Sequence, residues 1–464
     1  MLSSVGNFES NITFELNPIE GSHGTFKILQ YSLLYADTRS KEARAVSNSQ
    51  WLVESFRRLT ELYPISLGHR VQIPDQNIIV VSRDDRAKQR IYQHTEPQMT
   101  IGEFDRIKYR RDLWPPALNR LLSERTSDID CLISAVIVCL QDGYLITLSV
   151  SHIIADASGA ATLLQQWASL AAQHHLRSKG GISSLVPQAA IDFDHPAFWR
   201  RLTAYPPDTH PYVDYIEAQN FGSLDDIQSK LATYYKTGTL DNEKNLSMRV
   251  LHVSTVNIAK IAEQYNIDPE YRPLHGAQIM YALLWQRYVL AALAASPTKP
   301  GGNAPIFLNL LHNTRNLVSC PNYVGNGVST AYISLTIDSI ANIPVLELAH
   351  KIKPFVNSIT PGAAVHMAKA ISDPNSMFTL KAVYVCSLAA SHMTISNASR
   401  MPFYDIDFGL GTPLAVLWGT RPTEGMSSWL PHKDGIDINF GLNNAVYAIL
   451  KKDRILGEFI DFLN

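Results

Sequence analysis

The sequence predicts an α/β protein in two halves, and three observations support this prediction. The chain has 464 residues, more than one hydrophobic core usually organises, so two or three domains are expected. Strand-like apolar runs alternate with segments of helical period along most of the chain. Between the halves, residues 177–212 lose this periodicity and carry five prolines, which is typical of a linker. We therefore assign residues 1–180 and 226–464 to two domains, joined by a linker at 181–225.

The first half is predicted to contain strands, a hairpin and two helices. Residues 26–36 and 77–82 have the composition of strands, and residues 40–62 between them have a helical pattern. Residues 131–150 read as a hairpin, because two apolar, β-branched runs flank a Gln-Asp-Gly turn. Both runs are apolar almost throughout, which indicates that both faces of this sheet are covered. From Ser158 to Gln173 the apolar residues take a helical spacing.

The second half alternates strands and helices again. A strong helical pattern covers Pro273–Ala294, and a second helix is predicted at Pro344–Ile359. The predicted strands are Met248–Val256, Ile306–Leu311, Val328–Ile337 and four short segments at 382–388, 403–408, 413–418 and 435–440. This repeated alternation is the basis of the predicted α/β class.

The composition indicates a folded protein and argues against two kinds of partner. Hydrophobic residues make up 46% of the chain and charged residues 18%. The formal net charge of −2 gives no electrostatic basis for binding nucleic acid or an anionic membrane surface. The chain begins without a signal-peptide pattern, and no apolar run reaches the roughly 18 residues of a membrane span. We therefore expect a cytoplasmic protein that does not cross a membrane.

Several common kinds of site have no pattern in this sequence. The cysteines are widely spaced in apolar contexts and form no Cys-x-x-Cys pair, so we expect reduced, buried thiols and no metal site. They are Cys131, Cys139, Cys320 and Cys386. The sequence also lacks Gly-x-Ser-x-Gly, a phosphate-binding P-loop and His-Glu-x-x-His. Two bare Gly-x-Gly pairs lack the third glycine that a dinucleotide-binding loop needs.

A histidine and an aspartate four residues apart are the first candidates for chemistry. Residues 151–159 read Ser-His-Ile-Ile-Ala-Asp-Ala-Ser-Gly, so His152 follows an apolar strand and Asp156 precedes a helix. A neutral imidazole can act as a general base near pH 7, and strand-to-helix connections often carry catalytic groups. A structural alternative is that Asp156 only caps the helix while His152 makes a hydrogen bond at the strand end. The short motif alone leaves both interpretations open.

Five segments of the chain resemble the BAHD acyltransferases, in that family's order. The most specific are the His-x-x-x-Asp segment and, about 250 residues later, a counterpart of Asp-Phe-Gly-Trp-Gly. The five segments are Leu62-Tyr63-Pro64-Ile65 with Gly68-His69-Arg70; residues 144–159; Leu274–Trp285; Asn313-Thr314-Arg315 with Tyr323-Val324-Gly325-Asn326; and Met401–Pro413, which contains Asp407-Phe408-Gly409-Leu410-Gly411. The chain is most similar to the divergent, fungal-type branch of this family.

The resemblance implies a fold and an activity. The fold would be α/β, with two chloramphenicol-acetyltransferase-like domains, mixed sheets and a channel between them. Residues 412–430 would cross back into the first domain. The activity would be transfer of an acyl group from acyl-CoA, most often acetyl-CoA, to a small-molecule acceptor by a monomeric enzyme. CoA would be a co-substrate, with no permanently bound cofactor and no acyl-enzyme.

The resemblance also implies roles for individual residues. His152 would be the general base. Asp156 would point away from the reaction and pair with Arg315, which fixes the loop that bears His152. Asp407, Gly409 and Gly411 would shape a structural turn, while Ser396 and Asn397 are candidates for contact with the thioester or CoA.

Three residues depart from the family pattern. Ala157 stands where the family mostly has glycine, Leu410 replaces the usual tryptophan, and Ala398 replaces a tryptophan beside the thioester. The first departure bears on the size of the acceptor, and the last bears on the donors to the oxyanion.

Four activities stay open on the sequence. The leading one is O-acetylation of a small specialised metabolite, and an amine acceptor is the nearest alternative. A condensation-type enzyme would use a carrier-protein thioester, but Ser151 stands where that class has a second histidine. The fourth is a cyclase that keeps the acyltransferase fold, against which the presence of both His152 and Asp156 argues.

Overall fold

The computed structural model of the chain describes most of the sequence. The described residues are 12–16, 28–37, 49–73, 76–81, 90–96, 98–107, 109, 113–126, 132–178, 192–208, 245–266, 274–296, 301–356, 359–372, 392–420 and 422–463. They divide into two compact units, each with a sheet of its own. The first unit comprises Met1–Ala204, Val318–Gly327 and Met401–Thr420, and the second comprises Tyr205–Leu317, Val328–Arg400 and Arg421–Asn464.

The first unit is built on a five-stranded mixed sheet with strand order β12-β2-β7-β6-β5. Its strands are β2 (Ile28–Ala36), β5 (Ile91–Glu96), β6 (Ile133–Leu140), β7 (Gly143–Ser151) and β12 (Ala415–Trp418). Only β5 and β6 pair in parallel. A separate three-stranded antiparallel sheet contains β1 (Ile12–Glu15), β4 (Gln76–Val81) and β3 (His69–Ile73).

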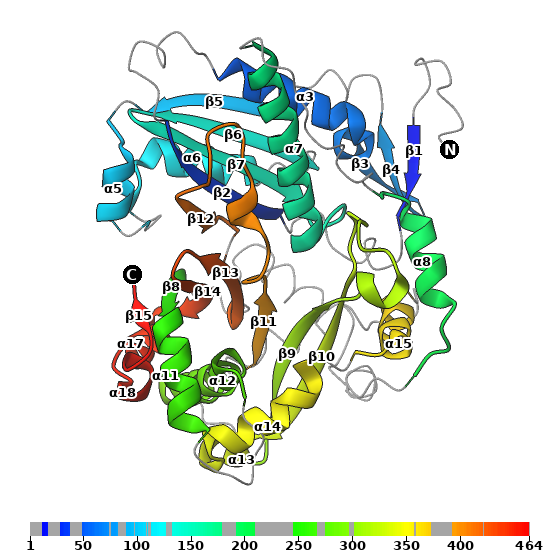
Figure 1. Ribbon diagram of the computed structural model, residues 1–464. Coiled ribbons are helices and arrows are strands. Elements are labelled where there is room, and N and C mark those ends of the chain that lie inside the picture. Colours follow the sequence, from blue (N-terminus) through cyan, green and yellow to red (C-terminus); the bar gives the residue numbers. More distant parts are fainter. Residues whose placement is uncertain are drawn as a thin grey trace. The chain divides into compact units, whose positions relative to one another are not determined.

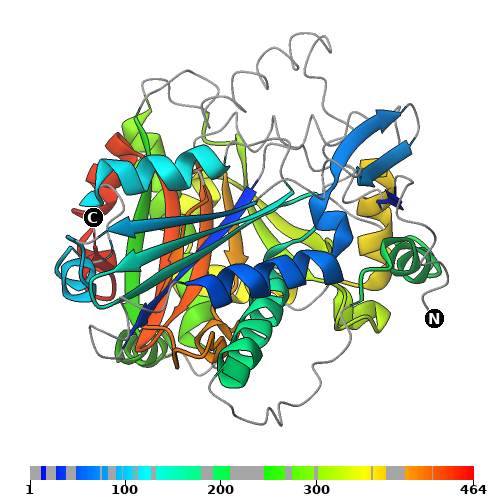
Figure 2. The same ribbon diagram turned by 90° about the horizontal axis from the view of Figure 1, so that it is seen from above.

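Helices cover both faces of the five-stranded sheet, as the apolar strands predict. Helices α3 (Gln50–Leu62) and α7 (Ala157–Ser178) lie together on one face, and α6 (Pro116–Thr126) lies on the other (Figure 2). Trp167 of α7 is fully buried, and its indole N–H donates to the Leu52 carbonyl of α3 at 3.1 Å. The shorter helices of this unit are η1 (Pro64–Leu67), α5 (Ile101–Arg106), α8 (His195–Thr203) and η4 (Phe403–Asp405).

The second unit is built on a seven-stranded mixed sheet with strand order β10-β9-β11-β13-β14-β8-β15. Its strands are β8 (Leu246–Ser254), β9 (Pro305–Asn313), β10 (Val328–Thr336), β11 (Met393–Asn397), β13 (Met426–His432), β14 (Gly435–Asn443) and β15 (Asp461–Phe462). Strand β11 runs parallel to both of its neighbours, and the other pairs are antiparallel. The predicted α/β class with mixed sheets is therefore confirmed.

Helix α12 (Gly276–Ala295) is the centre of the second unit's core. It is apolar on all sides, which is expected of a helix that other elements surround. Figure 1 shows it between α11 (Thr255–Tyr265) and α14 (Val345–Val356). The remaining helices are α13 (Ile337–Asn342), α15 (Pro361–Ser372), α17 (Asn444–Leu450) and α18 (Arg454–Gly457), with the short η3 (Arg315–Val318) at the chain boundary between the units. No helix in the described ranges has both the length and the apolar character to span a membrane.

Two predicted elements differ from the structure. The strand predicted at 403–408 is instead η4 followed by a turn, because the backbone N–H groups of Asp405 and Ile406 donate to the nearby carbonyls of Pro402 and Phe403 rather than to a neighbouring strand. The segment 177–212 is predicted to lack structure, yet it contains α8. Its Pro196 occupies the first turn of that helix, where proline is well tolerated, and Asp194 caps the helix.

Several other predictions can be compared with the structure only in part. The strand predicted at 382–388 and residues 40–48 of the first predicted helix lie outside the described residues. Residues 412–430 contain β12, which pairs with β2 in the first unit, but residues 426–430 belong to β13 in the sheet of the second unit. The domain limits drawn from the sequence stay a prediction.

Candidate functional site

His152 lies in a tight loop between β7 and α7. Strand β7 ends at Ser151, whose N–H donates to the Leu132 carbonyl at 2.8 Å, and the chain then turns so that the Ile154 N–H donates back to the Ser151 carbonyl at 3.1 Å. His152 itself is 8% exposed. The imidazole is therefore carried by a short connection between two regular elements, where its backbone has little freedom.

A distant segment of the chain fixes this loop. We call residues Tyr323–Gly327 the brace segment. The side-chain amide of Asn326 donates to the carbonyl of His152 and, at 3.4 Å, to that of Ile153. Asn326 is fully buried, and it lies 174 residues from His152 in the sequence. The backbone beneath the imidazole is thus tied to a side chain that cannot exchange its hydrogen bonds with water.

Asp156 joins the helix start to the brace segment. Its Oδ1 accepts the Gly159 N–H at 2.9 Å, which caps α7, and its Oδ2 accepts the Gly327 N–H, also at 2.9 Å. The side chain is 1% exposed, so these donors compensate for the loss of water around the carboxylate. Burial, and then the negative charge of Asp156, raises the pKa of Tyr31 on β2 far above its usual value.

Gly159 is where the backbone of α7 meets the brace segment. A Cβ atom at this position would lie 1.8 Å from the Val324 carbonyl oxygen, a separation that no side chain can adopt. Glycine is therefore required by close backbone approach, and the loop, the helix and the brace segment pack as one piece.

Helix α8 supports the brace segment. The hydroxyl of Tyr323 is hydrogen-bonded to Nδ1 of His195 at 3.0 Å, and the Phe198 ring stacks on Tyr323 with centroids 4.2 Å apart. The Val324 N–H donates to the Asp192 carbonyl at 2.9 Å. Part of the predicted linker, residues 192–198, thus contributes to the surroundings of His152 through the brace segment.

The Asp407 segment forms a turn around one carboxylate oxygen. Oδ1 of Asp407 accepts the N–H groups of Gly409, Leu410 and Gly411 at 2.7, 2.9 and 2.8 Å. Gly409 and Gly411 have φ values of 84° and 85°, which glycine adopts without steric cost. The intervening Phe408 is buried, with its ring 4.9 Å from that of Trp167 on α7.

A buried tyrosine joins the Asp407 turn to the five-stranded sheet. The hydroxyl of Tyr35 on β2 donates to the Ile406 carbonyl at 2.7 Å. Burial, and then the charge of Asp407, raises the pKa of Tyr35 well above its usual value, so the phenol stays a neutral donor. The turn is therefore fastened to the sheet and to the helix that follows the His152 loop.

The remaining candidates lie in the second unit. Arg315 is 2% exposed, and its backbone N–H and Nη1 both donate to Oδ1 of Asn313, at 3.0 and 3.1 Å. Ser396 and Asn397 end β11. The amide of Asn397 donates to the Tyr281 hydroxyl and accepts from the Ser399 N–H at 2.9 Å. The ion pair between Asp156 and Arg315, and the CoA contacts of Ser396 and Asn397, stay predictions.

The sequence did not identify the contributions of Asn326, Gly327 and Gly159 to the His152 loop. The only signal for the first two was their position in or beside the Tyr-Val-Gly-Asn stretch, which showed similarity to a family but no contact. A hydrogen bond between residues so far apart in the chain leaves no local pattern in the sequence.

Comparisons with known proteins agree on one architecture. A family model described as the Transferase family matches residues 114–454. TRI101 of F. graminearum, solved with coenzyme A and T-2 mycotoxin, has a TM-score of 0.73 at 16% identity, covering 98% of this chain and 100% of that one. TRI101 of F. sporotrichioides, with coenzyme A and T-2, has a TM-score of 0.68 at 14% identity, covering 97% and 100%. Vinorine synthase has a TM-score of 0.64 at 15% identity, covering 100% and 95%.

These three structures are similar to this chain in fold. A sequence search of curated proteins gives no significant match.

Proposed function

The chain belongs to the Transferase family of BAHD-type, acyl-CoA-dependent acyltransferases, and we propose that it transfers an acetyl group from acetyl-CoA to a hydroxyl group of a small specialised metabolite. The donor proposal is supported by the fold, which this chain shares with proteins solved with coenzyme A or ethyl coenzyme A. The acceptor proposal is supported by the small molecules bound to TRI101 of F. graminearum, which are T-2 mycotoxin in one solved structure and deoxynivalenol in another. The enzyme would work as a cytoplasmic monomer.

We propose that His152 is the general base. The acceptor alcohol is a weak nucleophile until its proton is removed, and a neutral imidazole removes that proton as the oxygen attacks the thioester carbon. The C–O bond forms while the carbonyl π pair moves to oxygen, which gives a tetrahedral oxyanion. When the oxyanion collapses, the C–S bond breaks, and the imidazolium returns its proton to the CoA thiolate. The products are the acetyl ester and free CoA, and His152 is regenerated.

One observation supports this proposal more than any other: several independent contacts fix the backbone of the His152 loop. Asn326 anchors its backbone, Asp156 closes it through two buried hydrogen bonds, and Gly159 allows the closest approach of the brace segment. A histidine that only ended a strand would not need a buried carboxylate and a buried amide from a remote segment. General-base catalysis does need a fixed imidazole, because a base must lie within hydrogen-bond distance of the proton before its pKa can have any effect on the rate.

The acceptor could carry an amine in place of a hydroxyl, since the base and the donor would be the same. An amine free base attacks a thioester without prior deprotonation, so it depends less on His152 than an alcohol does. The ratio of wild-type to His152→Ala rates on matched alcohol and amine acceptors therefore distinguishes the two acceptor classes.

The first experiment measures donor binding and then turnover. Calorimetric titration with acetyl-CoA should show saturable binding to wild type and to His152→Ala alike, because the base does not hold the donor. Thiol release is then followed with a panel of small alcohols and amines that includes T-2 mycotoxin, and the acetylated product is identified by mass spectrometry. We expect kcat for an alcohol to fall ~10²–10⁴-fold in His152→Ala.

A matched control separates catalysis from the general effect of losing an imidazole. His174 is half-exposed near the end of α7, where Nε2 lies 2.7 Å from a Glu54 carboxylate oxygen, and His174→Ala should keep wild-type turnover. Full activity in His152→Ala would rule out the base. Failure of wild type to bind acetyl-CoA or longer acyl-CoAs, with or without acceptor, would favour a carrier-protein donor or a cyclase.

A further inference from the structure

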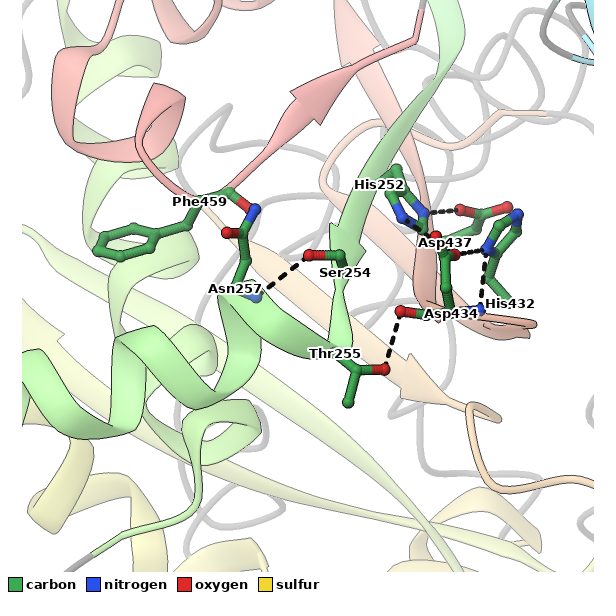
Figure 3. Close-up of polar contacts among 8 residues, drawn as sticks. All are labelled: His252, Ser254, Thr255, Asn257, His432, Asp434, Asp437 and Phe459. Atoms are coloured by element: carbon green, nitrogen blue, oxygen red, sulfur yellow. Dashed lines mark hydrogen bonds and ion pairs between the residues drawn. The ribbon is translucent and has the colours of Figure 1, made fainter.

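Two imidazoles and two carboxylates from distant parts of the sequence meet at one end of the β13–β14 hairpin in the second unit. His252 is on β8, His432 ends β13, Asp434 is in the hairpin turn and Asp437 is on β14 (Figure 3). Within the described residues, His252, His432 and Asp437 each offer a ligand atom, and these atoms all lie within 4.8 Å of one another.

The side chains point toward one another across the hairpin. Nδ1 of His252 lies 2.7 Å from Oδ1 of Asp437, and Nε2 of His252 lies 3.4 Å from Oδ1 of Asp434. The same Asp434 oxygen contacts Nδ1 of His432, and the two imidazole centroids are 4.5 Å apart. Each imidazole therefore has a carboxylate beside it, and both carboxylates surround His252 (Figure 3).

The charges around His252 favour a cation. In the sheet register His252 lies directly opposite Asp437 on β14 and opposite Asp461 on β15, so the three share one face of the sheet. Asp434 is also close to His252, so three carboxylates lie around this imidazole, and their negative charge would favour a divalent ion between the ligands.

The scaffold holds these groups in place before any ion binds. The Asp434 carbonyl accepts both the N–H and the hydroxyl of Thr255, at 2.6 and 2.8 Å, which fixes the hairpin turn to the start of α11. Ser254 caps that helix through the Asn257 N–H, at 3.1 Å. An ion could enter from solvent, because the Asp434 side chain is 68% exposed and that of His432 is 30% exposed.

We propose that His252, His432 and Asp437, with Asp434 completing the set, bind one divalent transition-metal ion, for which Zn²⁺ is the probe. Imidazole nitrogen together with carboxylate oxygen suits Zn²⁺, whereas Ca²⁺ and Mg²⁺ prefer oxygen ligands alone. The ion would tie the β13–β14 hairpin to β8 and stabilise the second unit. This inference does not depend on the proposed acyl transfer, and it revises the expectation of no metal site, which rested on spacing in the sequence.

The test is Zn²⁺ binding to the full chain, expressed without a histidine tag and freed of metal with a chelator. Calorimetry and thermal unfolding are recorded for wild type, His432→Ala, Asp437→Asn and Lys433→Ala. Because the chain has 15 histidines, the site is identified by the difference between variants. Wild type and the control Lys433→Ala, an exposed neighbour in the same turn, should bind one Zn²⁺ and unfold at a higher temperature with it.

His432→Ala and Asp437→Asn should bind Zn²⁺ at least ~10-fold more weakly and lose the rise in unfolding temperature. Circular dichroism of the metal-free variants checks that they fold. If Asp437→Asn does not fold, the result for His432→Ala decides the test. Absence of saturable binding in wild type, or wild-type affinity in a folded ligand variant, would overturn the proposal. Acetyl-CoA binding to the same samples is measured separately, so failure of the metal site and failure of the acyltransferase are distinguishable.

Discussion

At position 159 the structure has room for a hydrogen atom and nothing larger. The Val324 carbonyl would overlap any Cβ there, while the Gly159 N–H donates to the Asp156 carboxylate, which also accepts the Gly327 N–H of the brace segment. One glycine thus determines how closely α7 and the brace segment approach, and through them the position of the loop that bears His152.

Gly159→Ala should lower the stability of the first unit and the activity together. The methyl group would push the Val324 backbone away, which is overpacking against main chain and costs about 3 kcal/mol. Gly102→Ala is the matched control. Gly102 also lies in the first turn of a helix, but its nearest contact would be the Thr100 hydroxyl at 3.8 Å. Urea unfolding and turnover are measured for both variants. Equal unfolding midpoints for Gly159→Ala and Gly102→Ala would show that the brace segment can move away from the methyl group without loss of stability.

The sequence predicted the two ends of this arrangement but could not predict what joins them. His152 and Asp156 stand out because they are four residues apart between a predicted strand and a predicted helix, and because this segment resembles the His-x-x-x-Asp motif of a family; both are local signals. The roles of Asn326 and Gly327 depend on hydrogen bonds across more than 170 residues, which leave no period or spacing in the chain. The same separation hid the group formed by His252, His432 and Asp437.

At the scale of elements, the Asp407 turn connects a strand and a helix although it has no regular secondary structure itself. The Asp407 turn is attached to β2 through Tyr35 and to α7 through the contact of Phe408 with Trp167. The turn is stable because one carboxylate oxygen accepts three backbone N–H groups that have no partner in a sheet. The two glycines adopt the φ values that this arrangement requires.

Asp407→Ala should destabilise the turn far more than Asp407→Asn. Alanine removes the acceptor of three backbone N–H groups, at a cost of about 1–3 kcal/mol, whereas asparagine keeps an oxygen in the same position and loses only the charge. Thermal unfolding of the two variants measures the difference. If both unfold at the same temperature, the hydrogen bonds to Oδ1 contribute nothing, and the turn depends on the packing of Phe408 alone.

Element prediction failed where a residue acts at a boundary. Pro196 counted against a helix, although at the first turn it lacks only an N–H that would have no partner within the helix. Residues 403–408 have the apolar content of a strand, but the N–H groups of Asp405 and Ile406 donate to carbonyls only three residues back, which forms η4 in place of a strand. In both cases the local backbone geometry outweighed the average character of the segment.

At the scale of the molecule, buried histidines make stability depend on pH. His392, which precedes β11, is 6% exposed, and its Nδ1 accepts the Phe307 N–H at 3.3 Å. Burial lowers the pKa of His392 to about 4. In the unfolded chain this pKa returns to about 6.5. The lowered pKa contributes stability above pH ~6.5, and this contribution is lost as the pH falls toward ~4, because only the unfolded chain then takes up the proton.

His392→Asn should weaken this pH dependence, because the asparagine oxygen can accept the same N–H without binding a proton. Between about pH 7.5 and 5 the wild type should lose about 2 kcal/mol through this residue alone, and the variant should keep that amount. The difference is measured from urea unfolding midpoints at both pH values. Parallel losses in the two proteins would show that His392 does not titrate on unfolding in this range.

The remote origin of the brace segment and of β12 has a consequence for synthesis on the ribosome. At ~5–20 residues per second, the His152 loop waits roughly 10 to 35 s for Asn326 to emerge, and the free edge of β2 waits longer for β12. During this interval the nascent sheet presents an unpaired edge that can capture a wrong strand. Folding of the first unit is therefore completed only after most of the chain has left the ribosome, and we expect its yield to depend on chaperones that shield that edge.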